Sequence, residues 1–551
     1  MRTREIGCRE GNVRFVSPGR EGLAIAPWLL AIAAGFLLSG CGATDAGGDP
    51  DAVTADLPGE PGGPDDVLPE TPGEAVGEVG EDSTTADETP GAVTVPECCE
   101  VEDGRTVGNL LCQPGAYAGY TLFNPIFSRT TFLLDLCGRV VHSWPADCDM
   151  GSMVHLLDDG SILRGGLVEE SPLFMGGGAG KVQKIAWDGT LLWDFEYRGE
   201  NFIPHHDIAP LPNGNVLLIV WVRKSMEDAV AAGRDPDLVL EGDVLSESVV
   251  EIQPDGLNGG KVVWSWDIWD HLVQDFDRKK ANYGDVGEHP ERMDVNFPGH
   301  GMPAAGDLDW LHVNSIDYNA ELDQIVLGAL RSNEIFVIDH STTTEEAAGH
   351  TGGRYGKGGD ILYRWGNPQA YRAGNAKDQQ LFHQHDAQWI AKGSPGAGNF
   401  LIFNNGETRP EQEYSTIDEI QPPGAGDGFY PEEKGKAWGP KDKSWKYEEA
   451  NPTDFYSYFI SGAQRLPNGN TLVCDGPRGT FFEVTADGQR VWEYVNPIWM
   501  GGTLNQGDAL PAGLGGSKNH VFKIRKYAPE HPALAGRDLT PGPMIEGIRL
   551  P

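Results

Sequence analysis

Residues 463–473 read AQRLPNGNTLV, two short segments joined by Pro-Asn-Gly. An Asn-Gly pair between strand-forming residues favours a tight β-hairpin, because the preferred two-residue turn needs positive φ at both central positions. Related phrases occur at 156–163 (LLDDGSIL) and 209–219 (APLPNGNVLLI). The sequence therefore predicts a chain built from repeated antiparallel hairpins.

A second recurring motif is an aromatic-rich strand that ends each of the repeated units of the sequence. It occurs six times, as GRVVHSWP (138–145), DGTLLWDFEY (188–197), GKVVWSWDIWD (260–270), DILYRWGNP (360–368), SWKYEEANP (444–452) and GQRVWEYVNP (488–497). Six such copies with hairpins between them predict six four-stranded sheets arranged radially, an all-β six-bladed β-propeller. A β-sandwich pair or an eight-bladed propeller is the alternative.

The composition limits the class of partner. The chain has 551 residues, 74 of them glycine, and a formal net charge of −40. Abundant glycine suits many short strands joined by tight turns. Phosphate backbones bind cationic surfaces, so the negative charge argues against nucleic acid as the main partner.

The amino-terminal region predicts an exported lipoprotein. Five arginines precede the apolar run LAIAPWLLAIAAGFLL (23–38), which leads into Leu38-Ser39-Gly40-Cys41. That tetrapeptide resembles a bacterial lipobox, in which cleavage precedes the cysteine and lipid is attached to its thiol; a signal-anchor helix is the alternative. Gly42 resembles the residue found in lipoproteins sent to the outer membrane. The expected location is lipid-anchored, on the periplasmic or cell-surface side.

Three segments follow from this pattern. We expect a lipoprotein signal peptide at 1–40, a disordered acidic linker at 41–96 and the propeller at 97–551. No Lys or Arg occurs between Cys41 and Arg105, and the segment is rich in Pro, Gly and acidic residues. Such a chain cannot bury enough apolar surface to offset the entropy of ordering, so we interpret it as a self-repelling tether.

The cysteines fit an exported protein. Beyond Cys8 and Cys41, six remain, at 98, 99, 112, 137, 148 and 474. An even number clustered near the start of the folded part predicts disulfides that pin the amino-terminal segment, with the adjacent Cys98 and Cys99 bonded to different partners; the connectivity stays open. No paired CxxC motifs occur, which argues against a structural zinc site of that type.

Polar clusters open the first strand of three successive units. They are His205, His206 and Asp207 in one unit, His312 and Asn314 in the next, and His383 and His385 in the third. In a propeller the amino ends of the innermost strands surround the central channel. We therefore expect these residues at one mouth of the channel. A single histidine would more often cap a turn or join two blades, but three equivalent histidines favour a shared site.

Strand alternation refines this expectation. In an extended segment, His383 and His385 would point to the same face, and so would His312 and Asn314. Arg331, in GALRSNEIFVI (328–338), ends the neighbouring strand and is expected beside the second pair. Thr480, in CDGPRGTFFEV (474–484), occupies a similar place in the last unit.

Four segments carry a resemblance to a known family. They are HHDIAPLPNGN (205–215), DWLHVNSIDY (309–318), FHQHDAQW (382–389) and GAQRLPNGNTLV (462–473). They closely resemble the bacterial arylsulfate sulfotransferases, which move a sulfuryl group from one phenol to another without a nucleotide donor. The resemblance runs from roughly Gly119 to Tyr527. It implies a six-bladed propeller, a phenolic sulfate donor, a phenolic acceptor and no cofactor.

The resemblance also implies roles for residues. His385 matches the nucleophile that carries the sulfuryl group as a sulfohistidine. His312, Asn314 and Arg331 match residues that hold the sulfuryl oxygens and assist the leaving or attacking oxygen. His206, or alternatively His205, matches a further channel histidine. Thr480 matches a sulfate-binding threonine, although the local sequence PRGT departs from the family pattern.

The chemistry is compatible with these residues. A neutral imidazole is nucleophilic, and a positioned general acid for a phenolate leaving group contributes about 10²–10⁴ in rate; we assign that role to His312. Preorganised donors such as Arg331, Asn314 and Thr480 would meet the charge on the sulfuryl oxygens. These steps predict a ping-pong reaction.

Two other classes of function stay open at this stage. A metal-dependent propeller enzyme could use His205 or His206, His312, His383 and His385 as ligands, although Asn314 and Arg331 are poor neighbours for a divalent cation. A non-catalytic, surface-tethered binding propeller is the other alternative, because a fold does not fix a function.

Two further features concern the substrates. The sulfatase-like start Cys112-Gln113-Pro114 lacks the arginine of a C-x-P-x-R motif, which argues against a hydrolytic sulfatase. The segment from Asn404 to Tyr458 is rich in aromatic and charged residues, and we expect it to form loops over the channel mouth that select the acceptor.

Overall fold

Six antiparallel sheets make up the fold, and we call them blades 1 to 6. Blade 1 contains β2 (Tyr120–Pro125), β3 (Thr130–Leu134), β4 (Val140–Pro145) and β31 (Val521–Tyr527), and blade 2 contains β5 (Met150–Leu156), β6 (Ile162–Leu167), β7 (Gly180–Ile185) and β8 (Leu191–Glu196). Blade 3 contains β9 (Phe202–Pro210), β10 (Val216–Ser225), β11 (Asp243–Asp255) and β12 (Gly259–Asp267).

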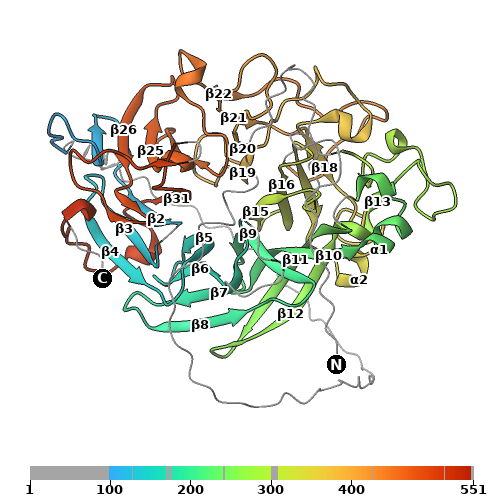
Figure 1. Ribbon diagram of the computed structural model, residues 1–551, viewed down its shortest axis with the longest axis horizontal. Coiled ribbons are helices and arrows are strands. Elements are labelled where there is room, and N and C mark those ends of the chain that lie inside the picture. Colours follow the sequence, from blue (N-terminus) through green and yellow to red (C-terminus); the bar gives the residue numbers. More distant parts are fainter. Residues whose placement is uncertain are drawn as a thin grey trace, which may run out of the picture. The chain divides into compact units, whose positions relative to one another are not determined.

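The other three blades follow in chain order. Blade 4 contains β15 (Val313–Asn319), β16 (Gln324–Ala329), β17 (Glu334–Asp339) and β18 (Tyr363–Trp365), and blade 5 contains β19 (His385–Trp389), β20 (Phe400–Asn404), β21 (Thr416–Ile420) and β22 (Trp445–Tyr447). Blade 6 contains β23 (Gly462–Arg465), β24 (Thr471–Asp475), β25 (Thr480–Val484) and β26 (Arg490–Val495), with β1 (Gly108–Cys112) added beside β26. Figure 1 shows these sheets arranged radially, with β31, β5, β9, β15 and β19 nearest the centre.

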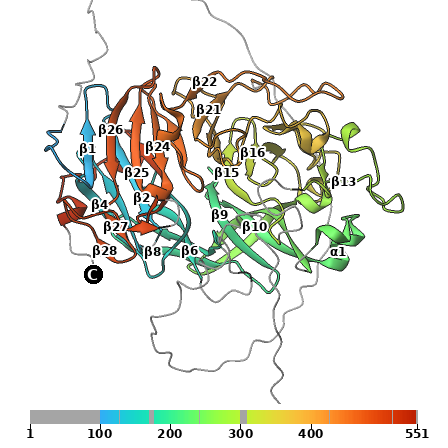
Figure 2. The same ribbon diagram turned by 45° about the horizontal axis from the view of Figure 1, so that its top comes forward.

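Only short elements join the blades in the described part of the chain. They are the helices α1 (Met226–Ala231) and α2 (Thr344–Ala347), and the strand pairs β13 (Leu272–Val273) with β14 (Met293–Asp294), β27 (Ile498–Trp499) with β28 (Gly502–Thr503) and β29 (Ala512–Gly513) with β30 (Gly516–Ser517). Single turns of 3₁₀ helix occur at η1 (Pro236–Leu238), η2 (Ile268–Asp270), η3 (Val286–Glu288), η4 (Pro368–Tyr371), η5 (Pro452–Asp454), η6 (Gly476–Arg478), η7 (Pro532–Leu534) and η8 (Ile545–Gly547). Figure 2 shows α1 and β13 at the edge of the molecule.

This computed structural model describes residues 99–547, apart from 127, 169–172, 174–175, 240–241, 299–307, 425 and 514–515. The predicted signal peptide, Cys41, the acidic linker and Cys98 lie outside the described residues. Among the described residues, no helix has the length and apolar character needed to span a bilayer.

The six-bladed prediction is confirmed, and each aromatic segment contains the outermost strand of its blade, apart from β1, which lies outside β26 in blade 6. The segments correspond to β4, β8, β12, β18, β22 and β26. The sequence suggested that the segment from Asn404 to Tyr458 forms loops, but this prediction is only partly right. It supplies β21 and β22, so blade 5 would be incomplete without it.

Tryptophans on these outer strands join consecutive blades. The indole N–H of Trp193 donates to Gly259 O at 2.8 Å, that of Trp365 to Pro440 O at 2.8 Å, and that of Trp492 to Leu136 O at 2.9 Å. Trp264 and Trp445 make equivalent bonds from blade 3 to blade 4 and from blade 5 to blade 6. A large apolar ring with one polar group suits this position, because the ring fills the space between sheets while its N–H finds a partner.

The two ends of the chain close the ring of blades. β31 pairs antiparallel with β2, placing Tyr120 opposite Tyr527, so the last strand of the protein is the innermost strand of the first blade. β1 pairs with β26 in the last blade. A disulfide joins Cys99 to Cys137 across 38 residues, which confirms the prediction of disulfides near the amino-terminal segment for this one pair; Cys148 and Cys474 form no disulfide.

Buried ion pairs cross the central axis between blades. Lys523 on β31 contacts Asp207 Oδ2 at 2.6 Å and Asp386 Oδ1 at 2.9 Å, and Arg525 Nη2 contacts Asp386 Oδ1 at 2.8 Å. The carboxylates also accept from backbone N–H groups of the next blade, Asp207 from Ile316 and Asp386 from Ala463. We call Asp207, Asp386, Lys523 and Arg525 the axial network.

The axial network generates a stability prediction. Asp386→Asn removes one charge and leaves Lys523 and Arg525 with uncompensated positive charge, which typically costs about 3–5 kcal/mol in a buried pair. Asparagine tolerates the positive φ of residue 386, so backbone strain is not added. We expect the midpoint of equilibrium urea unfolding to fall markedly. The exposed Asp188→Asn is the control, and equal midpoints for the two variants would contradict a structural role for the network.

Candidate active site

The channel histidines lie on irregular backbone. His206, His312 and His383 have φ of 52°, 51° and 54°, and the innermost strands β9, β15 and β19 take part in register shifts near these positions. A left-handed conformation costs a non-glycine residue about 1–2 kcal/mol and marks sites where tertiary structure fixes the backbone. His312 and His383 precede β15 and β19, so simple strand alternation does not describe the pairs that the sequence suggested.

Three predicted histidines nevertheless come together. The rings of His206 and His312 have centroids 4.5 Å apart, and both His312 and His385 act electrostatically on His206. Burial, with smaller contributions from the neighbouring histidines, holds the pKa of His206 well below its usual range. The residues come from blades 3, 4 and 5, so each blade contributes one imidazole to the cluster.

The tautomer of His385 is set by Asn405. His385 Nδ1 lies 2.8 Å from Asn405 Oδ1, and the amide nitrogen of Asn405 donates to Ser457 O and Ile460 O. The oxygen of Asn405 thus faces the imidazole, so His385 Nδ1 must donate and Nε2 carries the lone pair. Burial, with a further contribution from His312, lowers the pKa of His385 to about 3, so the ring is neutral near pH 7.

His312 forms a carboxylate–imidazole pair. Its Nδ1 hydrogen-bonds to Asp309 Oδ2, and Asp309 Oδ1 accepts from the indole N–H of Trp221 at 3.1 Å. Burial raises the pKa of Asp309, but His312 and the charge of Arg331 outweigh burial and bring it below its ordinary value. The ionised Asp309 orients His312 so that its Nε2 is available for proton transfer.

A chain of polar groups lies behind His206. Glu247 Oε2 lies 2.9 Å from His205 Nε2, and His205 Nδ1 lies 2.9 Å from His206 Nδ1. Burial and the charge of Asp309 raise the pKa of Glu247 well above its usual range, while burial lowers the pKa of His205 to about 3. Protonated Glu247 then donates to His205, and His205 donates to His206. The Nε2 of His206 consequently carries its proton.

His206 is therefore the member of the adjacent pair that joins the cluster. His205 stacks on Trp221 with ring centroids 3.9 Å apart and is only 1% exposed. Gly177 allows the loop before β7 to approach His206, because a Cβ there would lie 2.2 Å from the imidazole ring. The backbone N–H of His206 donates to Gly177 O at 2.7 Å.

The other predicted site residues, Arg331, Asn314 and Thr480, make different kinds of contact. Arg331 N donates to Leu311 O, and the Arg331 charge acts on Asp309, which places it beside the His312 pair. The amide of Asn314 is fully buried and donates to Gln384 O at 2.9 Å, so it joins blade 4 to the backbone beside His385. Thr480 Oγ1 lies 3.5 Å from Arg478 O within its own turn.

His383 has different hydrogen-bond partners from those of His385. Its Nδ1 lies 2.8 Å from Glu407 Oε2, and its backbone N–H donates to Asn333 Oδ1 at 2.7 Å. These contacts anchor the segment that leads into β19.

An apolar wall adjoins the histidines. Phe522, on the closing strand β31, lies 6.1 Å from His206 between ring centroids. It packs with Met150 and Ile460, and Ile126 and Phe459 pack against that group. The neutral imidazoles of His206 and His385 beside this aromatic surface suit a flat aryl group.

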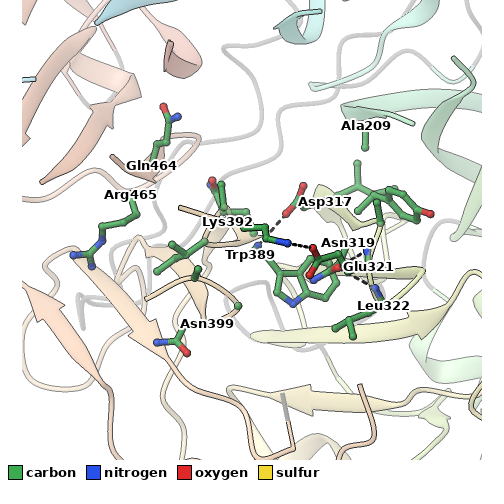
Figure 3. Close-up of a pocket in the computed structure, with 18 of the residues that line it drawn as sticks. Ala209, Asp317, Asn319, Glu321, Leu322, Trp389, Lys392, Asn399, Gln464 and Arg465 are labelled. Atoms are coloured by element: carbon green, nitrogen blue, oxygen red, sulfur yellow. Dashed lines mark hydrogen bonds and ion pairs between the residues drawn. The ribbon is translucent and has the colours of Figure 1, made fainter. Parts of the chain in front are cut away.

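The far side of the axial network opens into a cavity of 740 Å³. Its lining includes Asp207, Asp386 and Arg525 of the network but none of the three clustered histidines. Figure 3 shows this cavity, with Lys392 paired to Glu321 and the Trp389 backbone bonded to Asp317. The axial network thus lies between the cavity and the histidine cluster, and we place the candidate active site at the cluster.

Sequence reasoning missed several residues that set the chemistry of the cluster. They are Gly177, Trp221, Glu247, Asp309, Asn405 and Lys523. Asp309 was visible in DWLH and Asn405 in the FNNGE stretch after β20, but no spacing rule links either to its histidine. Glu247 in the middle of the long strand β11 was the clearest available signal, because a buried carboxyl group needs a specific partner.

Comparisons with known proteins agree with this architecture. The sequence model of the arylsulfotransferase (ASST) family matches residues 116–497, and the chain therefore belongs to that family of sulfotransferase enzymes. No curated protein matches the chain. The family match covers β2 to β26 and thus includes all three clustered histidines.

Solved structures provide only distant likenesses. A protein of unknown function from Bacteroides caccae is 10% identical, with a TM-score of 0.38, over 74% of this chain and 98% of that chain. A virginiamycin B lyase from Staphylococcus aureus is 10% identical, with a TM-score of 0.32, over 72% of this chain and 86% of that chain.

The raised pKa of Glu247 predicts a pH-dependent stability. The pKa of Glu247 in the folded protein lies above the ordinary value of 4.5. Protonation of Glu247 therefore contributes its full stabilisation below pH 4.5. This contribution is lost as the pH rises through the folded-state pKa. Glu247→Gln keeps the donor and cannot ionise. We expect its unfolding free energy, relative to wild type, to increase from pH 5 to pH 8. The exposed Glu227→Gln is the control; a flat difference for Glu247→Gln would show that Glu247 is ionised in the folded protein.

Proposed function

We propose that this protein moves a sulfuryl group from a phenolic sulfate ester to a phenolic acceptor by a ping-pong reaction through His385. Membership of the arylsulfotransferase family supports a sulfuryl transfer. The observation that carries the assignment is the hydrogen bond from His385 Nδ1 to Asn405 Oδ1, which leaves a neutral imidazole with its lone pair on Nε2. No proton competes with sulfur for that nitrogen near pH 7.

In the first half-reaction, His385 Nε2 forms a bond to sulfur. The bond between sulfur and the phenolic oxygen breaks, and its electron pair goes to that oxygen. His312 Nε2 supplies the proton, and the ionised Asp309 compensates the charge of the protonated imidazole before transfer. The products are free phenol, neutral His312 and sulfohistidine at position 385.

The second half-reaction reverses these steps. An acceptor phenol gives its proton to His312 Nε2 and attacks sulfur, and the electron pair of the N–S bond returns to His385 Nε2. The hydrogen bond from His385 Nδ1 to Asn405 is compatible with both states, because the sulfuryl group occupies only Nε2. The imidazole therefore need not change orientation between half-reactions.

Donors for the sulfuryl oxygens come from His206 and Arg331 in this scheme. The polar chain from Glu247 gives His206 a proton on Nε2, and Arg331 lies beside the His312 pair. Asn314 acts as a positioning residue through its bond to Gln384 O, next to the nucleophile. Thr480 is a further substrate-binding candidate by resemblance, and the Phe522 wall would receive the aryl ring.

We also propose that the protein works outside the cytoplasm on a lipid anchor at Cys41. The basic start, the apolar run and the Leu38-Ser39-Gly40-Cys41 tetrapeptide support export and lipidation. The acidic segment that follows would act as a flexible spacer between lipid and propeller.

The covalent intermediate is directly testable. Mixing the protein with p-nitrophenyl sulfate should give a burst of phenolate and a mass increase of about 80 Da, which disappears when a second phenol is added. His385→Ala should show neither the burst nor the adduct, whereas His531→Ala, at a histidine on the outer loops, should show both. Intact-mass spectrometry with rapid mixing measures these species.

Other outcomes would identify the alternatives. Activity that is lost with EDTA and leaves no adduct would favour the metal-dependent reading. Absence of any reaction over a range of aryl sulfates would favour the non-catalytic binding propeller.

The acid role of His312 predicts a dependence on the leaving group. His312→Ala should slow adduct formation by about 10²–10⁴ with phenyl sulfate, whose phenolate needs protonation, and by much less with p-nitrophenyl sulfate, whose phenolate is a weaker base. Single-turnover rates with the two donors give the comparison. Equal losses for both donors would assign His312 to sulfuryl binding and not to proton transfer.

A further inference from the structure

A second histidine cluster lies at the outer edge of the propeller, on residues that the reaction does not use. His271 directly follows η2 at the end of β12, the outermost strand of blade 3. His350 and Asp360 lie in the segment between α2 and β18 of blade 4. His271 and Asp360 are buried, and the side chain of His350 is 44% exposed. The cluster therefore joins two blades and has one side open to solvent.

The three side chains converge on one point. The Nδ1 atoms of His271 and His350 lie 2.9 Å and 2.8 Å from the same atom, Asp360 Oδ1. One ligand atom from each residue falls within 4.8 Å of the others. Two imidazole nitrogens and a carboxylate oxygen form the donor set that suits zinc and similar divalent transition metals.

The contact of His271 Nε2 determines which ring nitrogen of His271 carries the proton. His271 Nε2 lies 2.8 Å from Ala347 O, and a carbonyl oxygen can only accept. Nε2 therefore carries the proton, and in the neutral ring Nδ1 presents a lone pair to a carboxylate oxygen. Two acceptors at 2.9 Å require a cation between them, either a proton or a metal ion. Donation of the remote ring N–H to a backbone carbonyl is also the usual outer contact of a metal-bound histidine.

The surroundings hold this arrangement rigidly. His271 stacks on Trp266, and Trp266 donates its indole N–H to Gly359 O at 2.7 Å. A Cβ at Gly359 would lie 2.0 Å from Ala347 O and 2.5 Å from His271 Nε2, so only glycine lets the chain bring Asp360 to this place. The buried imidazole and carboxylate are thus fixed before any ligand arrives.

We propose that His271, His350 and Asp360 bind one divalent transition metal ion, with Zn²⁺ the best match, and that this ion fastens blade 3 to blade 4. Zinc ligand atoms lie about 3.3 Å apart around a tetrahedral ion, so small side-chain rotations from the present contacts would admit it. The exposed side of His350 leaves the fourth position to water. This site is separate from the sulfuryl-transfer cluster, and it does not depend on the proposed function.

Calorimetric titration of the EDTA-treated, dialysed full-length protein with Zn²⁺ tests the proposal. We expect one saturable site per chain, and at least a tenfold weaker affinity in His350→Ala and in Asp360→Asn. The exposed position of His350 means that its replacement should leave the fold intact, which circular dichroism checks. Zn²⁺ should also raise the thermal unfolding midpoint of the wild type but not of these variants. Mg²⁺ should have neither effect, because it prefers oxygen ligands.

The matched control is His289→Ala. His289 also pairs with a carboxylate, Glu291, at 2.9 Å but has no second imidazole in its described contacts. It should bind Zn²⁺ like the wild type. The proposal is overturned if the wild type shows no saturable binding, or if either His350→Ala or Asp360→Asn retains wild-type affinity; the cation between His271 and Asp360 would then be a proton.

Discussion

The position of Lys523 is the constraint on which the centre of the molecule depends. Lys523 lies on the last strand, which closes blade 1, and it contacts Asp207 of blade 3 and Asp386 of blade 5. Each aspartate adjoins a histidine of the cluster, His206 and His385, in the sequence. Closure of the ring therefore fixes the separation of the residues that would bind and attack the substrate. The buried charges are tolerated because each is paired and accepts or donates further hydrogen bonds.

The same network divides the channel into two environments. On one side lie the neutral imidazoles of His206 and His385 and the ring of Phe522. On the other lies a cavity whose lining mixes charged, polar and apolar side chains and includes Asp317, whose pKa burial raises to about 6. The proposed nucleophile His385 would benefit from this division, because burial keeps its imidazole neutral while the adjacent Lys523 disfavours its protonation.

Proton placement in the cluster follows from contacts outside it. Asn405 directs the lone pair of His385, Asp309 directs His312, and Glu247 acts on His206 through His205. In the proposed reaction, three imidazoles of the same chemical type would thus take three roles: nucleophile, acid–base group and hydrogen-bond donor. The three roles differ because each imidazole has a different hydrogen-bonding partner, as is common where titratable groups share a site.

The sequence by itself determined the class of fold, because hairpin turns and six aromatic outer strands are local patterns with local causes. It also indicated the clustered histidines, since the segments that contain His206, His312 and His385 each open the first strand of a successive unit. It could not determine the closing strand, the axial network or the partners of the histidines, because these join residues far apart in the chain, such as Asp207 and Lys523. Strand alternation failed at His312 and His383 for the same reason: tertiary contacts impose a left-handed backbone that no local preference predicts.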